Sequence, residues 1–386
     1  MRNKNGRLIA VVASVAVAAV AIGAALAYRQ GPQSGQANAA APLTTSPSPT
    51  PTTTPSTPSP SATPTKTPSA PTETKLTISK LPQGREPQVP YLIGREVRTS
   101  GYTETIPGKG GVLSVGRVQS SVLAVVMYEP DGDGTELLRI QAGTVNRRTP
   151  DVSSLVTTVD QTAAAYAAAR ISNLGVANKG ATVYAESGNS LQSLKLPNSW
   201  EVQVLAYTGG KVYYRASDKE TGPWKLYSWV PGEAQGQLIK TVVSPTAISA
   251  DGRTAASMGV RNDDGTCSTI VQASSGTQFF RTCEFQINGF TPNGATAYGV
   301  EDNAEGFCAG TSAAMEANSG KVLHQWKGCF QNMSSEDDQH VLVMAYATPA
   351  GQTEKVKTAI IRCTITTGSC ELATPIGTDT PLVIGS

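Results

Sequence analysis

Short apolar runs separated by polar turns fill the chain after Gly84. The runs are rich in β-branched and aromatic residues, Gly, Asn and Asp separate them, and no long amphipathic helical pattern occurs among them. This pattern is typical of an all-β domain made of many short strands. Gln161–Arg170 (QTAAAYAAAR) has the composition of a good helix, but its place in a sequence repeat favours a strand.

The repeat has a period in the low forties, and three segments show it most clearly: AISADGRTAASMGV from Ala247, GFTPNGATAYGV from Gly289 and NMSSEDDQHVLVMAY from Asn332. In each segment an apolar residue leads into a polar turn and then into a strand. These apolar residues are Ile248, Phe290 and Met333, which are 42 and 43 positions apart. Segments from Val118, Thr158 and Leu205 keep roughly the same register, so six units of 40–47 residues fit between about Gly116 and Pro375.

An all-β chain with this period predicts a β-propeller in which each repeat forms one four-stranded blade. Tyr91–Pro107 is predicted to form a strand pair before the first unit, and the C-terminal PLVIGS a lone strand after the last. Because a ring has to join its ends, we expect these two segments to share a blade. The count is then seven blades, with six as the alternative.

The turns and strands of ISADGRTAAS and FTPNGATAYG resemble those of the TolB-like and WD-repeat-like β-propeller families of the bacterial envelope. The resemblance covers roughly Val89–Ser386; no Trp-Asp dipeptide ends a blade, and the Ser-Pro-Asp-Gly motif of TolB is present in altered forms. The resemblance implies the propeller fold, and through TolB it suggests binding of a partner protein. With the N-terminal features below, the chain looks like the membrane-anchored propellers of actinobacteria.

The N-terminus carries an uncharged apolar run of 21 residues, Leu8–Tyr28. At ~1.5 Å per residue, a helix of this length spans the ~30 Å core of a bilayer. Three basic residues precede the run and only Arg29 follows closely, which predicts a cytoplasmic tail at residues 1–7 and export of everything after the anchor. The alternative is a signal peptide cleaved near Ala25-Leu26-Ala27, which would release a secreted protein.

Residues 29–84 are predicted to be a disordered linker. Between Pro42 and Pro71, 10 of 30 residues are Pro and 16 are Ser or Thr. Such a segment has too little apolar surface to offset its ordering entropy. As polyproline II it would extend up to ~90 Å, so we interpret it as a spacer, potentially O-glycosylated, that carries the propeller domain of residues 85–386.

The formal charge of +2 hides an uneven distribution. The first 72 residues contain no Asp or Glu, and the other 314 carry 26 basic and 29 acidic side chains. A mildly acidic domain argues against binding to nucleic acid.

All six cysteines lie in the last three repeats, two in each. Three pairs are centred on small-polar-Gly turns (SSG, NSG and TTG): Cys267 with Cys283, Cys308 with Cys329, and Cys363 with Cys370. Residues equidistant from a hairpin turn face each other across the ladder, within disulfide range. An even cysteine count in an exported chain also favours disulfides. We predict these three bonds, on the third and fourth strands of their blades.

Catalytic motifs are missing from the sequence. It has no phosphate-binding loop, dinucleotide fingerprint, His-Glu-x-x-His or nucleophile elbow. Of the two histidines, His324 lies in an apolar strand and is expected to pack, and His340 begins a strand and is expected at a surface or edge. We predict no catalytic and no cofactor-binding residue.

Acidic residues recur between the second and third strands of the repeat. They form EPDGDGTE (Glu129–Glu136), NDDG (Asn262–Gly265), EDNAEG (Glu301–Gly306) and the mixed-charge SDKETG (Ser217–Gly222). Two interpretations stay open: an acidic face that attracts a cation or a basic partner, or the ordinary chemistry of tight hairpins. The twelve-residue calcium loop is missing, so we predict no metal; if calcium did bind, its candidate ligands would be Asp131, Asp133, Asp263 and Asp264.

One repeat concentrates six aromatic residues: Tyr207, Tyr213, Tyr214, Trp224, Tyr227 and Trp229. They could form a platform for a sugar or peptide. Their alternation instead places aromatics on both faces of the strands, which favours packing between blades.

The sequence therefore predicts a non-enzymatic extracellular propeller, tethered to the cell membrane, that binds a protein or glycan of the cell envelope. One alternative is an exported propeller enzyme of the lactonase or glycan-lyase class with an unidentified active site. Another is a structural or sensor ectodomain. Asp, His and Arg converging on the central channel would favour the enzyme.

Overall fold

The computed structural model describes residues 72–99, 101–128, 134–171, 177–220, 222–259, 266–302, 308–347, 355–378 and 380–385. The chain divides into two units, Met1–Ala70 and Pro71–Ser386, and all described residues belong to the second. The predicted tail, the anchor Leu8–Tyr28 and most of the predicted linker lie outside them. No helix within the described ranges is long and apolar enough to cross a membrane.

Four-stranded antiparallel sheets dominate these residues, as predicted for an all-β domain. One sheet joins both ends of the unit: β2 (Tyr91–Ile93), β3 (Glu96–Thr99), β4 (Tyr102–Thr105) and β29 (Leu382–Ile384). The next two sheets consist of β5 (Val112–Val118), β6 (Ser121–Met127), β7 (Thr135–Gln141) and β8 (Thr144–Pro150), and of β9 (Val152–Thr157), β10 (Ala163–Ile171), β11 (Ala177–Ser187) and β12 (Ser190–Leu196). Two more follow: β13 (Glu201–Thr208), β14 (Lys211–Ser217), β15 (Lys225–Trp229) and β16 (Gln237–Val243), then β17 (Pro245–Ile248), β18 (Thr254–Met258), β19 (Ser268–Gln272) and β20 (Gln278–Thr282).

The last sheet has nine strands because one long strand joins two groups. Its members are β21 (Phe285–Phe290), β22 (Thr296–Glu301), β23 (Ala309–Glu316), β24 (Val322–Ser335), β25 (His340–Tyr346), β26 (Lys357–Thr364), β27 (Cys370–Leu372), β28 (Gly377–Thr378) and β1 (Thr72–Lys75). The first part of β24 pairs with β23, and its last part, from Phe330, pairs with β25. β24 is therefore the outermost strand of the first group and, from Phe330 on, the innermost strand of the second group.

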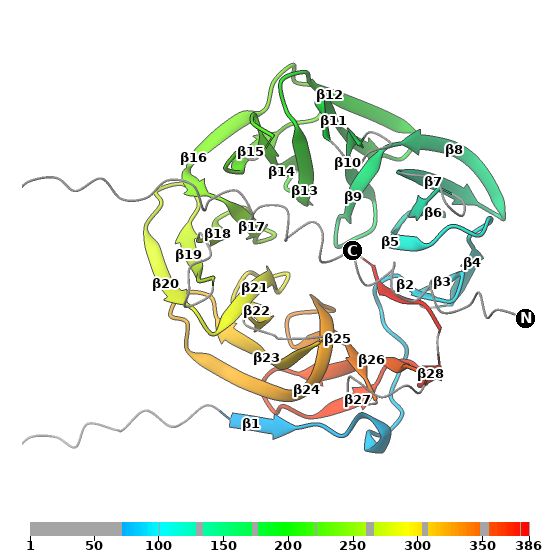
Figure 1. The fold of residues 1–386 in the computed structure, drawn as a ribbon, viewed down its shortest axis with the longest axis vertical. Helices are drawn as coiled ribbons and strands as arrows, with labels where there is room; N and C mark the ends of the chain where they lie inside the picture. Colours follow the sequence, from blue (N-terminus) through cyan, green and yellow to red (C-terminus); the bar gives the residue numbers. More distant parts are fainter. Residues whose placement is uncertain are drawn as a thin grey trace, which may run out of the picture. The chain divides into compact units, whose positions relative to one another are not determined.

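The sheets stand around a ring (Figure 1). Their innermost strands β5, β9, β13, β17, β21, the end of β24, and β29 contact one another in turn. The ring closes where β29 pairs with β2, with Tyr91 opposite Ile384. This domain is a β-propeller. The expected union of the two terminal segments is confirmed, although the N-terminal segment contributes three strands rather than a pair.

The core lies between neighbouring sheets, so most strands bury side chains on both faces. The alanine-rich segment forms strand β10, as predicted from the repeat, and not a helix. Its residues Ala164, Ala165 and Ala167 are fully buried. Ala164 packs in one interface with Leu123, and Ala165 packs in the next with Val204. Small side chains on both faces allow close approach of two neighbouring sheets.

The three predicted disulfides are present, with Cα atoms 4.0, 5.3 and 4.1 Å apart in chain order. Each joins a third strand or its start to a fourth strand or its end. Cys363 and Cys370 lie directly opposite each other in the ladder. Cys308 and Cys329 do not, contrary to the expectation, because two bulges shift the register between β23 and β24.

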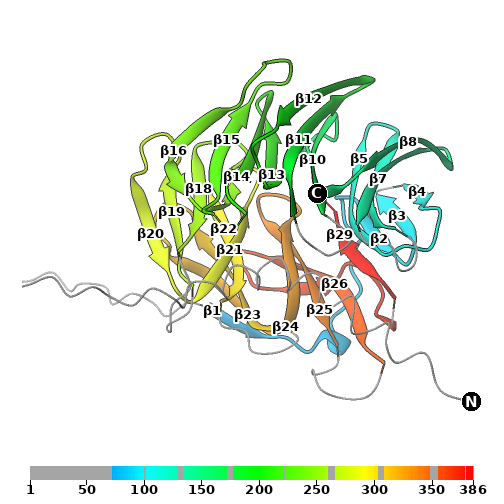
Figure 2. The same cartoon turned by 45° about the horizontal axis from the view of Figure 1, so that its top comes forward.

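The propeller begins earlier than the boundary expected at Gly84. Strand β1 pairs in parallel with β24, with Thr72 opposite His324 and Lys75 opposite Lys327, and it lies along the outside of the last sheet (Figures 1 and 2). Ile78, in the short 3₁₀ helix Ile78–Lys80, is buried. The segment before Gly84 therefore adds a strand to a sheet edge, although its composition is polar.

Candidate functional site

The innermost strands share one irregularity. In six of them an extra residue forms a β-bulge against the second strand of the sheet: Leu113, Ser153, Leu205, Thr246, Asn288 and Gln331. Bulges of this kind redirect side chains and bend the strand locally. Ile248, Phe290 and Met333 lie two residues beyond their bulges, which confirms that they are equivalent.

The bulges also correct the expected length of one repeat. Ser153 and Leu205 are 52 positions apart, longer than the predicted range of 40–47. The longer unit contains β10 and β11, which have nine and eleven residues.

Exposed side chains on the innermost strands reach solvent through the centre of the ring, because neighbouring sheets cover both faces of each strand. In the described part of these strands they are Leu113, Ser153, Asn288, Gln331 and Asn332. Four of the five are bulge residues, and none is charged. The bulges thus present uncharged and mainly polar side chains on the inner side of the ring, which we call the channel wall. The charged residues Arg117 of β5 and Glu201 of β13 are half-buried.

Three carboxamides on this wall gather on two adjacent innermost strands. Asn288 is the bulge residue of β21, and Gln331 and Asn332 occupy the bulge position and the next position in β24. The hydroxyl of Tyr346 donates to Oε1 of Gln331 at 2.7 Å, and the backbone N–H of Met333 donates to Oδ1 of Asn332 at 2.8 Å. Both side-chain oxygens are therefore engaged.

The hydroxyl of Tyr346 is protonated at neutral pH, as phenols ordinarily are, and burial raises its pKa further, to about 12. Tyr346 consequently holds Gln331 with its amide nitrogen directed away from the phenol.

A second polar group lies beside β13. Nε of Arg215 donates to Oε1 of Gln203 at 2.8 Å, and Nη1 donates to the carbonyl of Pro245 at 2.9 Å. The guanidinium stacks over Trp224 at 4.5 Å. Burial lowers the pKa of Arg215 to about 10, and Arg215 stays charged and holds two neighbouring sheets together.

Glu201, on the innermost strand β13, interacts electrostatically with Arg215. Burial raises the pKa of its carboxyl, an effect that the positive charge of Arg215 partly opposes. No second carboxylate joins it among the described residues of the innermost strands, and the pairing needed for acid–base catalysis at a glycosidic bond is absent there.

The predicted acidic loops fall at the expected place, between the second and third strands of their sheets. Their candidate calcium ligands, Asp131, Asp133, Asp263 and Asp264, lie outside the described residues. The two interpretations of these loops both remain predictions.

The histidines occupy different environments, as expected. His324 is buried, and its Nε2 lies 2.8 Å from Oγ1 of Thr74 on β1. Burial lowers the pKa of its imidazole. His340 begins β25, and its Nδ1 lies 2.9 Å from the carboxylate of Asp337, whose oxygen also accepts the His340 backbone N–H.

Glu336, Asp337 and His340 together form a cluster with metal-ligand side chains. Glu336 is already occupied: the guanidinium of Arg362 makes a two-pronged contact with it, one bond being 2.7 Å. The Gln88 N–H also donates to Glu336 at 2.7 Å. With its charge balanced by arginine, Glu336 belongs to a structural ion pair rather than to a cation site.

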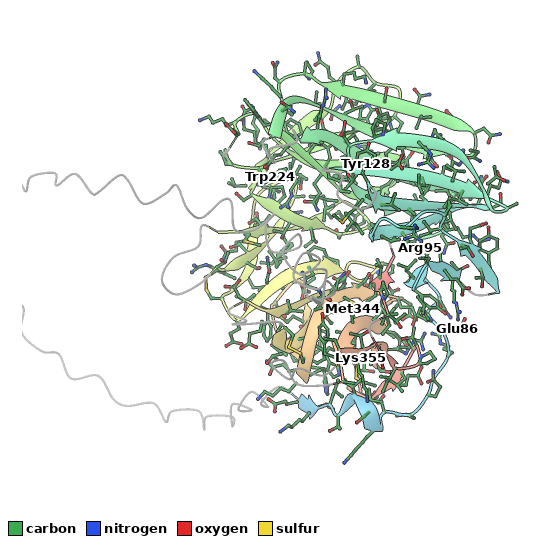
Figure 3. The ribbon with its side chains drawn as sticks, turned by 45° about the vertical axis from the view of Figure 1, so that its right-hand side comes forward. Glu86, Arg95, Tyr128, Trp224, Met344 and Lys355 are labelled. Carbon is green, nitrogen blue, oxygen red and sulfur yellow. A yellow bond between two sulfur atoms is a disulfide. The ribbon has the colours of Figure 1, made fainter. Side chains whose placement is uncertain are left out.

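The aromatic residues of the fourth sheet mostly pack, as favoured above. Tyr214 and Trp229 are buried, and Tyr214 stacks on Tyr227 with ring centroids 5.2 Å apart. Figure 3 shows Trp224, Tyr128 and Met344 on three different sheets of the ring. Tyr207, Tyr213 and Tyr227 are half-buried and pack against the apolar clusters of this sheet and its neighbours.

Sequence reasoning missed the carboxamide wall. The repeat segments begin at Gly289 and Asn332, so Asn288 and Gln331 lie just outside them. Asn288 and Gln331 both precede a repeat-defining apolar residue by two positions, a signal that becomes readable once the bulge is known.

Comparison with known proteins finds distant structural similarity. No protein-family model matches the sequence, and no curated protein matches it. Similar solved structures include TolB from Acinetobacter baumannii, with 14% identity over 64% of this chain and 67% of that one and a TM-score of 0.39. An uncharacterized protein from Listeria monocytogenes has 11% identity over 70% and 84% of the two chains, with a TM-score of 0.46.

A structure from a study of two prolyl endopeptidases is also similar, with 10% identity, 72% of this chain and 50% of that one covered, and a TM-score of 0.44. These similar structures include a TolB, the family that the sequence resembles, and a prolyl endopeptidase. At these identities the likeness concerns the fold alone.

Proposed function

We propose that the protein is a membrane-tethered extracellular propeller that binds a protein or glycan partner in the cell envelope and is not itself an enzyme. The observation that carries the proposal is the set of exposed side chains on the innermost strands, which among the described residues are carboxamides, Ser153 and Leu113. Carboxamides bind through hydrogen bonds but supply neither a general acid or base nor a nucleophile. The three disulfides support an oxidising location outside the cytoplasm.

We further propose that the ring has seven blades. The nine-stranded sheet then counts as two blades joined by β24, and β1 is an additional outer strand. The anchor at Leu8–Tyr28 and the Pro/Ser/Thr-rich spacer would place this ring at a distance from the membrane surface.

Binding of the full-length protein, in detergent, to isolated cell envelopes tests the proposal. We expect saturable retention that is lost when the envelopes are pretreated with protease, if the partner is a protein, or with glycan-degrading enzymes, if it is a glycan. A panel of lactones and polysaccharide substrates is incubated in parallel. Turnover of any of them, or no retention by untreated envelopes, would overturn the proposal.

A further inference from the structure

The carboxamides of the channel wall are oriented, and their orientation restricts the ligand. The oxygen of Asn332 accepts a backbone N–H, which can only donate, so its amide nitrogen must be the free end. The oxygen of Gln331 accepts the Tyr346 hydroxyl. Neither amide nitrogen has a hydrogen-bond partner among the described residues, and both side chains are exposed.

This side of the channel therefore offers N–H donors without a positive charge. Asn288, exposed on the adjacent strand at the same bulge position, adds a carboxamide whose two ends are both unengaged among the described residues. A wall of fixed donors suits groups that only accept, such as amide carbonyls. Sugar hydroxyls both donate and accept, and they gain less from such a wall.

The wall also has an apolar element. Leu113, the bulge residue of β5, is 39% exposed on the same channel. A polypeptide in extended conformation combines carbonyl acceptors with apolar side chains and can use both features. The exposed side chains of the wall carry no charge, so they do not require acidic or basic residues in such a segment.

We propose that this wall binds the backbone carbonyls of an extended, largely uncharged peptide segment of a partner protein, through the amide nitrogens of Gln331 and Asn332. The inference rests on the proposed binding function and commits it to a protein partner. Tyr346 acts as a positioning residue, because its hydroxyl keeps the Gln331 amide from rotating.

A random dodecapeptide library displayed on phage, panned against the full-length protein in detergent, tests this site. We expect enriched uncharged peptides that lose affinity about tenfold or more in Gln331→Glu/Asn332→Asp, since each change replaces a donor with an acceptor that repels carbonyls. Gln192→Glu, an exposed carboxamide on the outermost strand β12, is the matched control and should bind like the wild type. Tyr346→Phe should weaken binding while leaving the amide donors in place.

The outcomes separate this inference from the proposed function. Peptides that bind wild type and double variant equally, or retention on a glycan array with no peptide enriched, would overturn the peptide site but leave a binding protein. No ligand in either format would count against both. Thermal unfolding of the double variant at the wild-type temperature shows that a lost affinity is not lost folding.

Discussion

Gly368 shows how closely single residues fit in the last sheet. It lies in the turn between β26 and β27 with φ of 70°, and a Cβ there would overlap the imidazole of buried His324. Gly210 has a similar φ of 72° with open space around it. The two positions therefore separate backbone strain from steric crowding.

We expect Gly368→Ala to lower the free energy of unfolding by about 2–5 kcal/mol, the sum of left-handed strain and overpacking. Gly210→Ala should lower it by only about 1–2 kcal/mol, from the strain alone. Chemical denaturation of both variants measures the difference. Equal losses would show that the space around Gly368 is not limiting.

His324 predicts a pH dependence of stability. Its folded pKa lies below its unfolded value of about 6.5, because burial disfavours the charged ring. The unfolded chain thus binds the proton more readily, and stability falls as the pH drops below about 6.5. Between pH 6.5 and 5 the loss from this group is at most about 2 kcal/mol.

The variants His324→Gln and His340→Asn test the assignment by denaturation at pH 7 and pH 5. His324→Gln should flatten the pH dependence in this window, while His340→Asn should keep it. If His324→Gln retained the full wild-type slope, another group would be responsible.

At the scale of elements, a buried ion pair holds the N-terminal segment to the last sheet. Arg362 on β26 is 4% exposed at its side chain and Glu336 is fully buried. Arg362 also donates to the carbonyls of Arg85 and Glu86, each at 2.9 Å; Glu86 is marked in Figure 3. Arg362 thereby holds the segment between the 3₁₀ helix and β2 against β26.

We expect Arg362→Met to lower the free energy of unfolding by about 3 kcal/mol, because buried Glu336 then keeps only the half-exposed Arg85, at 3.5 Å, as a counter-charge. It should also expose residues 85–88 to limited proteolysis. The double variant Arg362→Met/Glu336→Gln should recover part of the loss. Arg253→Ala breaks a mostly exposed pair with Asp251 and should cost no more than about 1 kcal/mol.

At the scale of the whole molecule, stability depends on closing the ring. Only three residue pairs join β29 to β2, yet they connect the two ends of the unit. Removing residues 382–386 would leave β2 unpaired on its inner side and open interfaces on both sides of that sheet. The loss should therefore reach beyond the deleted strand.

We expect this truncation to lower Tm by about 10 °C or more and to broaden the transition. Removing Ser386 alone keeps β29 and should leave Tm unchanged. Calorimetry of both variants measures the effect. A truncated chain that unfolds like the full one would mean that the closing pairs contribute little.

Local chemistry made several features predictable from sequence. The spacings of 42 and 43 residues between Ile248, Phe290 and Met333 depend on one apolar residue and one turn per unit, and both are short-range signals. The cysteine pairs followed from symmetry about their turns, and β10 followed from the repeat despite its helical composition. These features need no knowledge of how the sheets are arranged.

Contacts between distant segments could not be read in the same way. Nothing in the polar residues before Gly84 identifies β24, some 250 positions later, as the partner of β1, because backbone pairing carries little sequence information. Likewise, the candidate site at Gln331 and Asn332 depends on two features that the sequence does not show. One is the bulge that turns these side chains toward the channel, and the other is the hydrogen bond from Tyr346 to the Gln331 oxygen. By itself the sequence determined the all-β repeat, the disulfides and the joining of the ends, since these follow from periodicity and local turns. Tertiary structure alone decided the N-terminal strand, the Arg362–Glu336 pair and the donor wall, since each depends on which distant backbones and side chains come together.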